Sequence, residues 1–489
     1  MAPVLTLDIG SSSARALLYS GAGEEMEGFE AREQYHASTT EDGGWEIGAA
    51  ELTAIAAKTL DAICAQLRTR GLKPDAVAVD TFWHSILGVA ADGTPVTPVL
   101  HPFDSRSAAA ARELAKRIDN ATQHRRTGCM LHPSYPPAKL MWLKETQPEV
   151  FQKAARWMTF GEYLFLELFG VPVCSTSMIS ASGLWNQNAG DYDREMIEAL
   201  PISRDQLAAP EQMDEPQRKL QGAFRQRWPE LDGIPWFPAL GDGACDNVGS
   251  GCGTRDRFAL MVGTSGAMRA CVETNAIEIP PGLFCYRVDR RRFVLGGALS
   301  NGGEVFAWMR RTLQLPGTNE IEKQLAGLPP GQHGLTIVPL FAGERSPGWR
   351  ADAHAAITGL GAGTSPLEIL HAALESVALT FRDVYELMEP ALGAPKEVIA
   401  SGGALLHSGV WTQMMADTLC HTVIQCLEPE ATSRGAALLA LERIGAIPSI
   451  NAPAPKLGAR ITPDASKQEL YQAALERQRR LYRKLFEEN

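Results

Sequence analysis

The chain has 489 residues, with 46 Lys and Arg against 57 Asp and Glu, which gives a formal net charge of −11 at pH 7. A protein that binds nucleic acid or an acidic membrane surface through its charge needs the opposite balance, so both classes are disfavoured. With 45% hydrophobic and 21% charged residues, the composition is that of a folded globular protein. The length suggests roughly two or three domains.

The nine cysteines are odd in number, scattered and without any CxxC pair. We therefore expect buried thiols in a reducing compartment, rather than a disulfide framework or a zinc site. The first ten residues, MAPVLTLDIG, hold neither a basic segment nor a long apolar run, and the chain holds no stretch of 18 apolar residues. These observations predict a cytoplasmic protein without a signal peptide or a membrane span.

A β-rich run at 4–9 ends in a turn of small residues, and residues 5–16 read LTLDIGSSSARA. Successive backbone N–H groups and hydroxyls at such a turn form a concavity that binds anions, and glycine permits φ > 0 and close approach of a ligand. Asp8 precedes the glycine. A carboxylate there would repel a phosphate unless a cation lay between them, so Asp8 is the candidate Mg²⁺ residue, directly or through water. A plain strand-end Asp is the alternative.

Helical and β-rich patterns then alternate along the chain. A helical pattern at 51–68 precedes a β-rich run at 76–80, and a second helical pattern follows at 105–118. This alternation predicts an α/β domain in which helices cover a sheet.

Two polar segments of this region suit a polyhydroxylated ligand. Trp83 and His84 follow the second β-rich run, and Asp104 and Arg106 lie in the loop 101–106. An aromatic ring gives apolar contact while the polar groups fix hydroxyls. Each segment alone is weak, since a Trp-His pair is usually packing.

A further carboxylate follows the short apolar strand predicted at 234–240. Asp242 opens the small-residue run DGACDNVGSGCG, and taken alone it is a candidate helix N-cap. Its place just before another small-residue turn favours a catalytic role. Asp246, four residues on and on the same helical face, is the competing candidate.

That later turn repeats the first one, because residues 258–270 read FALMVGTSGAMRA. Aligning Gly10 with Gly263 also aligns the two hydroxyl residues that follow each glycine. The repeat predicts two duplicated halves, 1–250 and 251–489, with a boundary near 249–254.

Two such turns facing each other would grip a polyphosphate from both sides of a cleft. Neither fits the P-loop pattern GxxxxGK[ST] or the dinucleotide pattern GxGxxG. The candidate phosphate-binding residues are Gly10, Ser11, Ser12, Ser13, Gly263, Thr264 and Ser265.

The clearest helix is predicted at 366–388, where Ser365 and Glu368 supply a capping box and apolar residues recur on one face. The segment 399–408 then reads as a strand, two glycines and the start of a helix, an arrangement that suits the phosphates or ribose of a nucleotide. A simple strand-to-helix turn is the alternative. A last helix carries several Arg and Lys residues, which we interpret as a solvated face.

Together these motifs resemble the FGGY carbohydrate kinases of the actin/hexokinase superfamily. LDIGSSSAR resembles that family's first phosphate hairpin, with Arg15 in the basic position, and MVGTSG resembles the second. GDGACDNVG is similar to the segment whose first Asp is the catalytic base, which assigns that role to Asp242 rather than Asp246. The segments 338–349, 357–375, 400–423 and 433–440 resemble later signatures of the family.

The resemblance implies an α/β fold of two duplicated actin/hexokinase-like (ribonuclease H-like) domains with a cleft between them. It also implies ATP and Mg²⁺. The nucleotide residues expected from the second half are Gly302, Gly402, Gly403 and Ala404, besides the hairpin.

Segments 127–145, 180–185 and 300–308 are more similar to gluconate kinases than to glycerol or xylulose kinases. The implied reaction is transfer of the ATP γ-phosphoryl group to a primary hydroxyl, with Asp242 as base and D-gluconate as acceptor. Trp83, His84, Asp104 and Arg106 would hold the substrate. Arg106 is the nearest cation for a carboxylate, and His84 would donate a hydrogen bond.

Three alternatives stay open. The chain could phosphorylate a pentulose or polyol, as xylulokinases do. It could instead be a non-catalytic, ATP-driven binding or assembly protein of the actin-like superfamily, although Asp242 has no evident use there. A sugar-sensing regulator would need a DNA-binding module, and no basic helical segment precedes Leu5. Formation of a homodimer is also left open.

Overall fold

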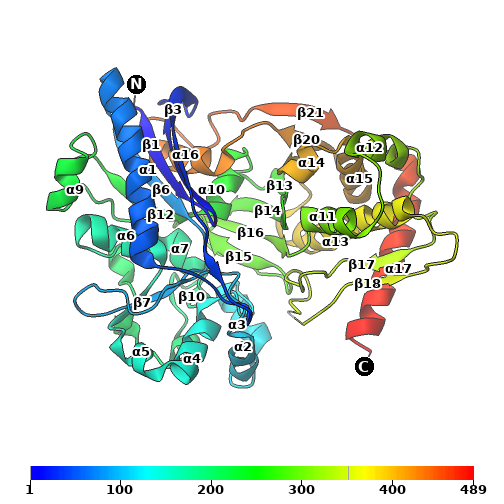
Figure 1. Cartoon of the computed structure of the whole chain (residues 1–489), viewed down its shortest axis with the longest axis horizontal. Coiled ribbons are helices and arrows are strands. Elements are labelled where there is room, and N and C mark those ends of the chain that lie inside the picture. The colour runs from blue at the N-terminus through cyan, green and yellow to red at the C-terminus, as the bar shows by residue number, and fades with distance from the viewer. Residues whose placement is uncertain (1, 351, 489) are drawn as a thin grey trace.

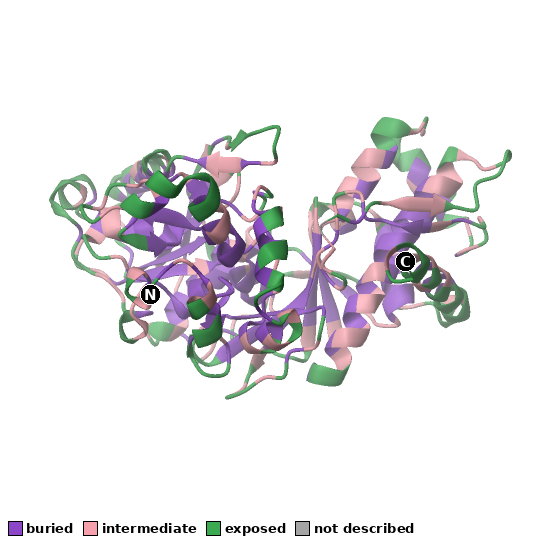
Figure 2. Ribbon diagram, turned by 90° about the horizontal axis from the view of Figure 1, so that it is seen from below, coloured by how far each residue is buried: buried purple, intermediate pink, exposed green. Residues whose placement is uncertain are grey.

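The computed structural model describes residues 2–350 and 352–488, and its elements form two lobes (Figures 1 and 2). Buried strands run through the middle of each lobe, and the exposed helices lie outside them (Figure 2). The two halves are built on the same pattern of strands.

The sheet of the first lobe has β1 at its centre, paired antiparallel with β2 on one side and parallel with β6 on the other. Strand β2 continues antiparallel to β3, and β6 continues parallel to β12. Across the sheet the strands are β12 (Trp236–Gly241), β6 (Ala76–Thr81), β1 (Val4–Ile9), β2 (Ser13–Tyr19) and β3 (Glu25–Gln34).

The second sheet repeats this arrangement around β13, which pairs antiparallel with β14 and parallel with β19. Strands β16 and β20 then take the places of β3 and β12, and β15 and β21 add an antiparallel strand at either edge. Across the sheet the strands are β15 (Phe284–Arg287), β16 (Arg292–Leu299), β14 (Gly266–Glu273), β13 (Arg257–Val262), β19 (Glu397–Ser401), β20 (Val423–Cys426) and β21 (Leu457–Ile461). The predicted duplicated α/β fold is confirmed.

Short strands form smaller ribbons. They are β4 (Ser38–Thr39), β5 (Trp45–Ile47) and β8 (Val99–Leu100) in one, β7 (Leu87–Val89) and β9 (Arg156–Met158) in another, β10 (Trp185–Asn186) with β11 (Asp191–Tyr192), and β17 (Thr336–Val338) with β18 (Ala356–Thr358).

The helices of the first half are α1 (Ala49–Arg70), α2 (Ala108–Ala115), α3 (Asn120–Thr127), α4 (Pro136–Thr146), α5 (Pro148–Lys153), α6 (Phe160–Phe169), α7 (Thr176–Ser180), α8 (Arg194–Ala199), α9 (Gly222–Arg227) and α10 (Asp242–Gly249). Those of the second half are α11 (Gly303–Thr312), α12 (Thr318–Ala326), α13 (Pro366–Leu392), α14 (Gly403–Leu406), α15 (Gly409–Leu419), α16 (Ala431–Arg443) and α17 (Gln468–Phe486). Single 3₁₀ turns lie at Arg204–Gln206, Pro210–Gln212 and Ala465–Lys467.

Helix α13 begins where its capping signals predict. The Ser365 side chain accepts a hydrogen bond from the Glu368 N–H at 3.3 Å, and the Glu368 carboxylate accepts one from the Ser365 N–H at 2.7 Å. The helix runs a turn beyond the predicted end, through Pro390, and its apolar face lies in the core of the second lobe.

Helix α16 belongs to the second half of the sequence but packs on the first sheet. Its Leu438 and Leu441 lie in one apolar cluster with Val4 and Ala78 of that sheet, and Figure 1 shows α16 beside β1 and α10. Helices α10 and α16 cross closely, since a Cβ on Gly435 would stand 1.8 Å from the Cys245 carbonyl oxygen. The core of the first lobe therefore depends on the end of the chain.

All nine cysteines are free thiols, and Cys420 alone is not fully buried, so the expected absence of a disulfide framework agrees with the structure. Among the described residues, no helix is long and apolar enough to cross a membrane.

Candidate active site

Three carboxylates meet at the carboxyl ends of neighbouring parallel strands. Asp8 on β1 and Asp80 on β6 are register partners, and Asp80 is in turn the partner of Leu240 on β12, two residues before Asp242. Asp8 and Asp242 are sequence-predicted site residues. Asp80 was missed, because its place beside them depends on strand register.

Asp242 is the first residue of α10 and is partly buried. Its Oδ1 accepts a hydrogen bond from the Gly243 N–H at 2.8 Å, and burial raises the pKa of its carboxyl group to about 6. Among the described residues no cation pairs with it. Asp246, the competing candidate, forms an ion pair with Arg269 of β14. The structure thus leaves Asp242, rather than Asp246, as the unpaired carboxylate.

Asp8 lies in a network of charges. Its Oδ2 is 3.4 Å from the Arg15 guanidinium, which also pairs with Glu430 from the other half of the chain. Burial raises the pKa of Asp8, and the charge of Arg15 opposes that shift. Arg15, predicted to face phosphate, is therefore already engaged by two carboxylates.

The first hairpin is an open turn. The Gly10 N–H donates to the Ser13 carbonyl at 3.0 Å, and the Tyr35 hydroxyl donates to the Gly10 carbonyl. Gly10 does not adopt a positive φ, and a Cβ there would come no nearer than 3.7 Å to other atoms. The turn does not use the left-handed backbone that glycine permits, and Ser11, Ser12 and Ser13 stay at least partly exposed.

The second hairpin is enclosed by glycines from two other segments. The Gly303 N–H donates to the Gly263 carbonyl at 2.7 Å, and a Cβ on Gly302 would lie 2.4 Å from the Ser265 carbonyl oxygen. Gly402 has φ 87°, and a Cβ there would lie 2.3 Å from the Val262 carbonyl oxygen. The predicted nucleotide residues brought together here are Gly263, Thr264, Ser265, Gly302, Gly402, Gly403 and Ala404.

His84 lies in the left-handed region, with φ 64°, beside the aromatic side chains of the first lobe. Its Nδ1 is 2.6 Å from the Ala181 carbonyl oxygen, which can only accept, so Nδ1 carries the proton. Burial lowers the pKa of the ring to about 3. The neutral Nε2 can therefore only accept a hydrogen bond. With this tautomer the ring presents an acceptor, where the sequence had predicted a donor to a carboxylate.

Aromatic rings surround His84. Trp83 donates from Nε1 to the Ser177 carbonyl at 3.1 Å and packs edge-on against Tyr286, with ring centroids 5.0 Å apart. Tyr135 and Tyr286 share a hydrogen bond of 2.6 Å between their hydroxyls, and both rings meet His84 edge-on. The two tyrosines were missed because they come from α4's N-cap and from β15, far apart in the sequence.

Arg345 of the second lobe extends toward this aromatic group. Its Nη2 donates to the Leu299 carbonyl at 2.9 Å, and its charge interacts with Tyr135 and Tyr286. Burial lowers the pKa of the guanidinium. Among the described residues no carboxylate pairs with Arg345. The segment that carries it was matched to a family signature, but the residue itself was not predicted.

Arg106 is, by contrast, already neutralised. Its Nε lies 3.1 Å from each carboxylate oxygen of Asp104, and its Nη2 lies 2.9 Å from Glu46. The guanidinium also stacks over Trp142, 4.6 Å from the ring centroid. The predicted substrate pair Asp104–Arg106 is thus a closed ion pair that shapes the loop.

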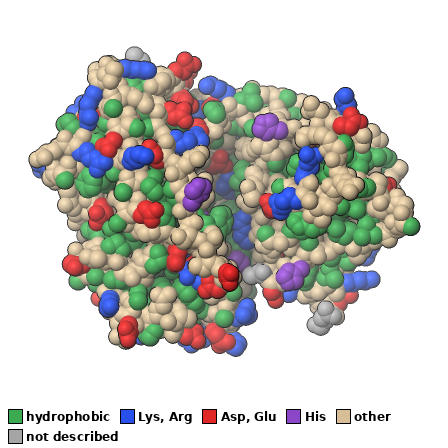
Figure 3. All heavy atoms as spheres, in the orientation of Figure 1, with side chains coloured by type: hydrophobic (Ala, Val, Ile, Leu, Met, Phe, Trp, Pro, Cys, Tyr) green, Lys and Arg blue, Asp and Glu red, His purple; other side chains and the backbone are tan. Residues whose placement is uncertain are grey.

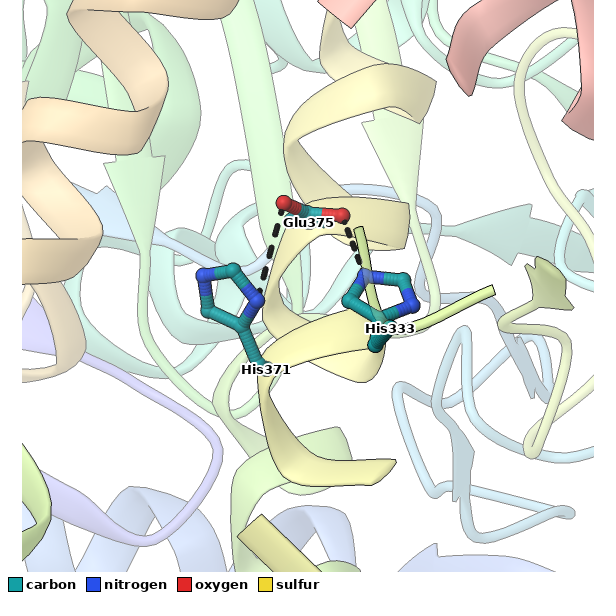
Figure 4. A group of neighbouring side chains, drawn as sticks. All are labelled: His333, His371 and Glu375. Carbon is teal, nitrogen blue, oxygen red and sulfur yellow. Dashed lines mark hydrogen bonds and ion pairs between the residues drawn. The ribbon is translucent and has the colours of Figure 1, made fainter. Parts of the chain in front are cut away.

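A second cluster of side chains that can ligate a metal ion lies in the other lobe, where His333, His371 and Glu375 converge (Figure 4). His333 Nδ1 accepts from the Leu335 N–H at 3.0 Å, so its Nε2 carries the proton and donates to Glu375 at 2.8 Å. A metal ion could take Nε2 only by displacing that proton. The Gly331 N–H also donates to Glu375, and the cluster fastens this loop to α13.

The space-filling view shows the molecule hollowed between its two lobes, with acidic, basic and histidine side chains inside the hollow (Figure 3). A family model described as the FGGY family of carbohydrate kinases, N-terminal domain, matches residues 3–249, and its C-terminal counterpart matches residues 258–442. The chain belongs to this family. It is therefore a carbohydrate kinase, whose family uses ATP as phosphoryl donor.

Curated relatives of the chain have different substrates in their names. The gluconokinase of Bacillus subtilis is 27% identical over 489 residues, covering 95% of this chain and 93% of that protein. The glycerol kinase of Trichlorobacter lovleyi is 28% identical over 460 residues, covering 91% and 90%.

Solved structures share the fold across the whole chain. The ligand-bound xylulose kinase of Lactobacillus acidophilus matches with a TM-score of 0.92 at 23% identity, covering 100% of this chain and 99% of that one. The gluconate kinase of the same organism gives the same values. The two-domain actin/hexokinase-like fold is thereby confirmed.

Proposed function

We propose that this kinase transfers the γ-phosphoryl group of ATP to the primary hydroxyl of a sugar acid, D-gluconate. The observation that carries the phosphoryl transfer is the unpaired carboxylate of Asp242 at the head of α10, near the Asp8 hairpin. Similarity to curated gluconokinases over nearly the whole chain supports the choice of acceptor.

In this mechanism Asp242 accepts the hydroxyl proton as the phosphoryl group is transferred. Its raised pKa makes it a stronger base than an ordinary aspartate and leaves it ionised at neutral pH. Asp246 lies one helical turn on and forms its own ion pair with Arg269 of β14, which leaves the two carboxylates with separate roles.

The backbone N–H groups and hydroxyls of the two hairpins would bind the phosphates, and closure of the lobes would exclude water from the acceptor. The residues also fit a divalent cation, since Asp8 presents a buried carboxylate whose partner Arg15 is shared with Glu430. Asp8 would hold that cation. When bound, Mg²⁺ neutralises charge on the phosphate oxygens.

Arg345 is the side chain that we assign to the gluconate carboxylate. It carries a positive charge beside the aromatic group and is not paired with an acid among the described residues, whereas Arg106 is held by Asp104 and Glu46. A charge-assisted, bidentate hydrogen bond suits a guanidinium and a carboxylate. The Nε2 of His84 would accept from a substrate hydroxyl, and Trp83 would give apolar contact.

The test is a coupled ATPase assay with gluconate, xylulose, ribulose, glycerol and erythritol. We expect gluconate to give the highest kcat/KM. In Arg345→Gln, kcat/KM for gluconate should fall by about tenfold or more, the value of a charged hydrogen bond, while that for any neutral acceptor changes little.

Arg106→Gln is the matched control, because it removes a guanidinium that is already paired. It should change kcat/KM for gluconate and for the neutral acceptors by the same factor. Equal losses for acid and neutral acceptors in Arg345→Gln would contradict the carboxylate assignment. A clear preference for xylulose or a polyol would replace gluconate with that neutral substrate.

A further inference from the structure

Asp80 is a buried carboxylate that the proposed reaction does not use. It is 0% exposed, and among the described residues no N–H or hydroxyl group donates to either of its carboxylate oxygens, although its carboxyl group contacts that of Asp8. It lies on the central strand of the three that end at the site, between Asp8 and the end of β12. A carboxylate buried without a donor is costly unless a cation or a proton compensates its charge.

The surrounding charges do not compensate it. The carboxylates are Asp8, Asp80, Asp242 and Glu430, and the guanidiniums that pair with any of them are those of Arg15 and Arg32. Asp246 and Arg269 form a balanced pair beside them. Arg32 also pairs with Glu30, so with every group ionised the cluster carries an excess of negative charge, which a bound cation would offset.

The carboxylates of Asp8 and Asp242 lie near the buried Asp80 and add like charges beside it. The side chain is held there by the sheet, since residues 76 and 78, on the same face of β6, pack in the first core with α16.

We propose that Asp80, together with Asp8, binds a divalent cation of the magnesium class at the carboxyl ends of β1 and β6. Magnesium is usually held in proteins by one or two carboxylates, with water and substrate phosphates as the other ligands, and this pair provides that set. The assignment rests on the proposed kinase function of the site. It leaves Asp242 free to act as the base.

The direct test is a Mn²⁺ titration followed by electron paramagnetic resonance, without nucleotide or sugar. The wild-type protein should bind one Mn²⁺ that Mg²⁺ displaces. Asp80→Asn keeps the shape of the side chain and removes its charge, and it should weaken binding by about tenfold or more, as the loss of a metal ligand does. Unchanged Mn²⁺ affinity in Asp80→Asn, or no binding by the wild-type protein, overturns the proposal.

Asp246→Asn is the matched control, because it removes a nearby carboxylate, on α10, that already has its own guanidinium. It should keep the wild-type affinity for Mn²⁺. Equal weakening in Asp246→Asn and Asp80→Asn would mean that only the general negative charge matters, and would also overturn the proposal. Asp80→Ser serves as a second variant if the amide does not fold.

Thermal unfolding gives a second readout, which separates a metal ligand from a structural residue. In chelator at neutral pH, Asp80→Asn should unfold at no lower a temperature than the wild type, because the amide keeps the shape of the side chain and needs no cation. Added Mg²⁺ should raise the midpoint of the wild type and leave that of Asp80→Asn unchanged. A lower midpoint for Asp80→Asn in chelator, or an equal response to Mg²⁺, contradicts the proposal.

These measurements separate the metal site from the reaction. Loss of Mn²⁺ binding in Asp80→Asn, in a protein that phosphorylates no member of the sugar panel, would keep the cation site and reject the proposed function. An active gluconate kinase whose Mn²⁺ affinity does not depend on Asp80 would keep the proposed function and reject the role of Asp80 in the cation site.

Discussion

The two glycine hairpins have the same place in two sheets of the same topology, yet their surroundings differ. The first, after β1, is open around Gly10 and lies beside the carboxylates of Asp8 and Asp80. The second, after β13, has Met261 in the place of Asp8 and is enclosed by Gly302, Gly303 and Gly402. The two halves share the backbone pattern but differ in side chains. The first hairpin lies beside carboxylates, and the second is surrounded by glycines that leave backbone groups accessible.

This difference suggests a division of labour between the lobes. An acidic hairpin suits a cation and the reacting phosphoryl group, and a hairpin packed with glycines suits close approach of a nucleotide's phosphates. Substitutions matched between the lobes can test the division.

The largest effect is expected at the acidic lobe. Asp242→Asn removes the base while keeping the shape of the side chain, so kcat should fall by roughly 10²–10⁴-fold. ATP binding, measured by isothermal titration calorimetry, should stay near the wild-type value. Wild-type turnover in Asp242→Asn would reject the assignment, and an inactive Asp246→Asn with active Asp242→Asn would move the base to Asp246.

A smaller effect is expected in the glycine-rich lobe. Gly402→Ala places a Cβ on a residue with φ 87°, 2.3 Å from the Val262 carbonyl oxygen. The free energy of unfolding should fall by about 1–3 kcal/mol, as measured by urea denaturation, because the backbone of the second hairpin must shift. ADP should bind more weakly as well. Wild-type stability would show that the glycines do not constrain that hairpin.

The pH dependence should follow the acidic lobe. Since burial raises the pKa of Asp242 to about 6, kcat should be constant above that pH and fall about tenfold per unit below it, as the base takes up a proton. The effect of Asp242 on the free energy of unfolding changes with pH in the opposite direction to its effect on kcat. A carboxyl whose pKa is raised on folding stabilises the protein at low pH and loses this contribution as the pH rises through about 6. A kcat that stays constant down to pH 4 would contradict the role of Asp242 as the base.

The smallest effect is expected at the open hairpin. Gly10→Ala meets no atom nearer than 3.7 Å, so the free energy of unfolding should change by no more than about 0.5 kcal/mol. A loss comparable to that of Gly402→Ala, in parallel urea titrations, would show that the two hairpins are equally constrained.

Much of the fold could be predicted from local signals. The capping box at Ser365 located the start of α13, and the apolar run at 76–80 located β6. The predicted helix at 105–118 was too long, because the Asp104 carboxylate accepts from the Arg106 N–H and shapes a turn before α2 begins at Ala108.

The site was predictable where a residue belongs to a turn and not where it depends on pairing between distant strands. Asp8 and Asp242 follow recognisable motifs, whereas Asp80 looks like the end of an ordinary buried strand until β1 and β12 are placed beside it. Arg106 and Arg345 are equally charged in sequence. Only their partners in space distinguish the paired guanidinium from the unpaired one.

The packing of α16 on the first sheet has a consequence for synthesis on the ribosome. The strands and α1 of the first lobe emerge early, but the helix that covers Val4 and Ala78 is made near the end of the chain. Until then, that face of the sheet presents apolar side chains to water or to other molecules. The first lobe can complete its core only after nearly all of the second has been translated, so the two lobes mature together rather than in sequence.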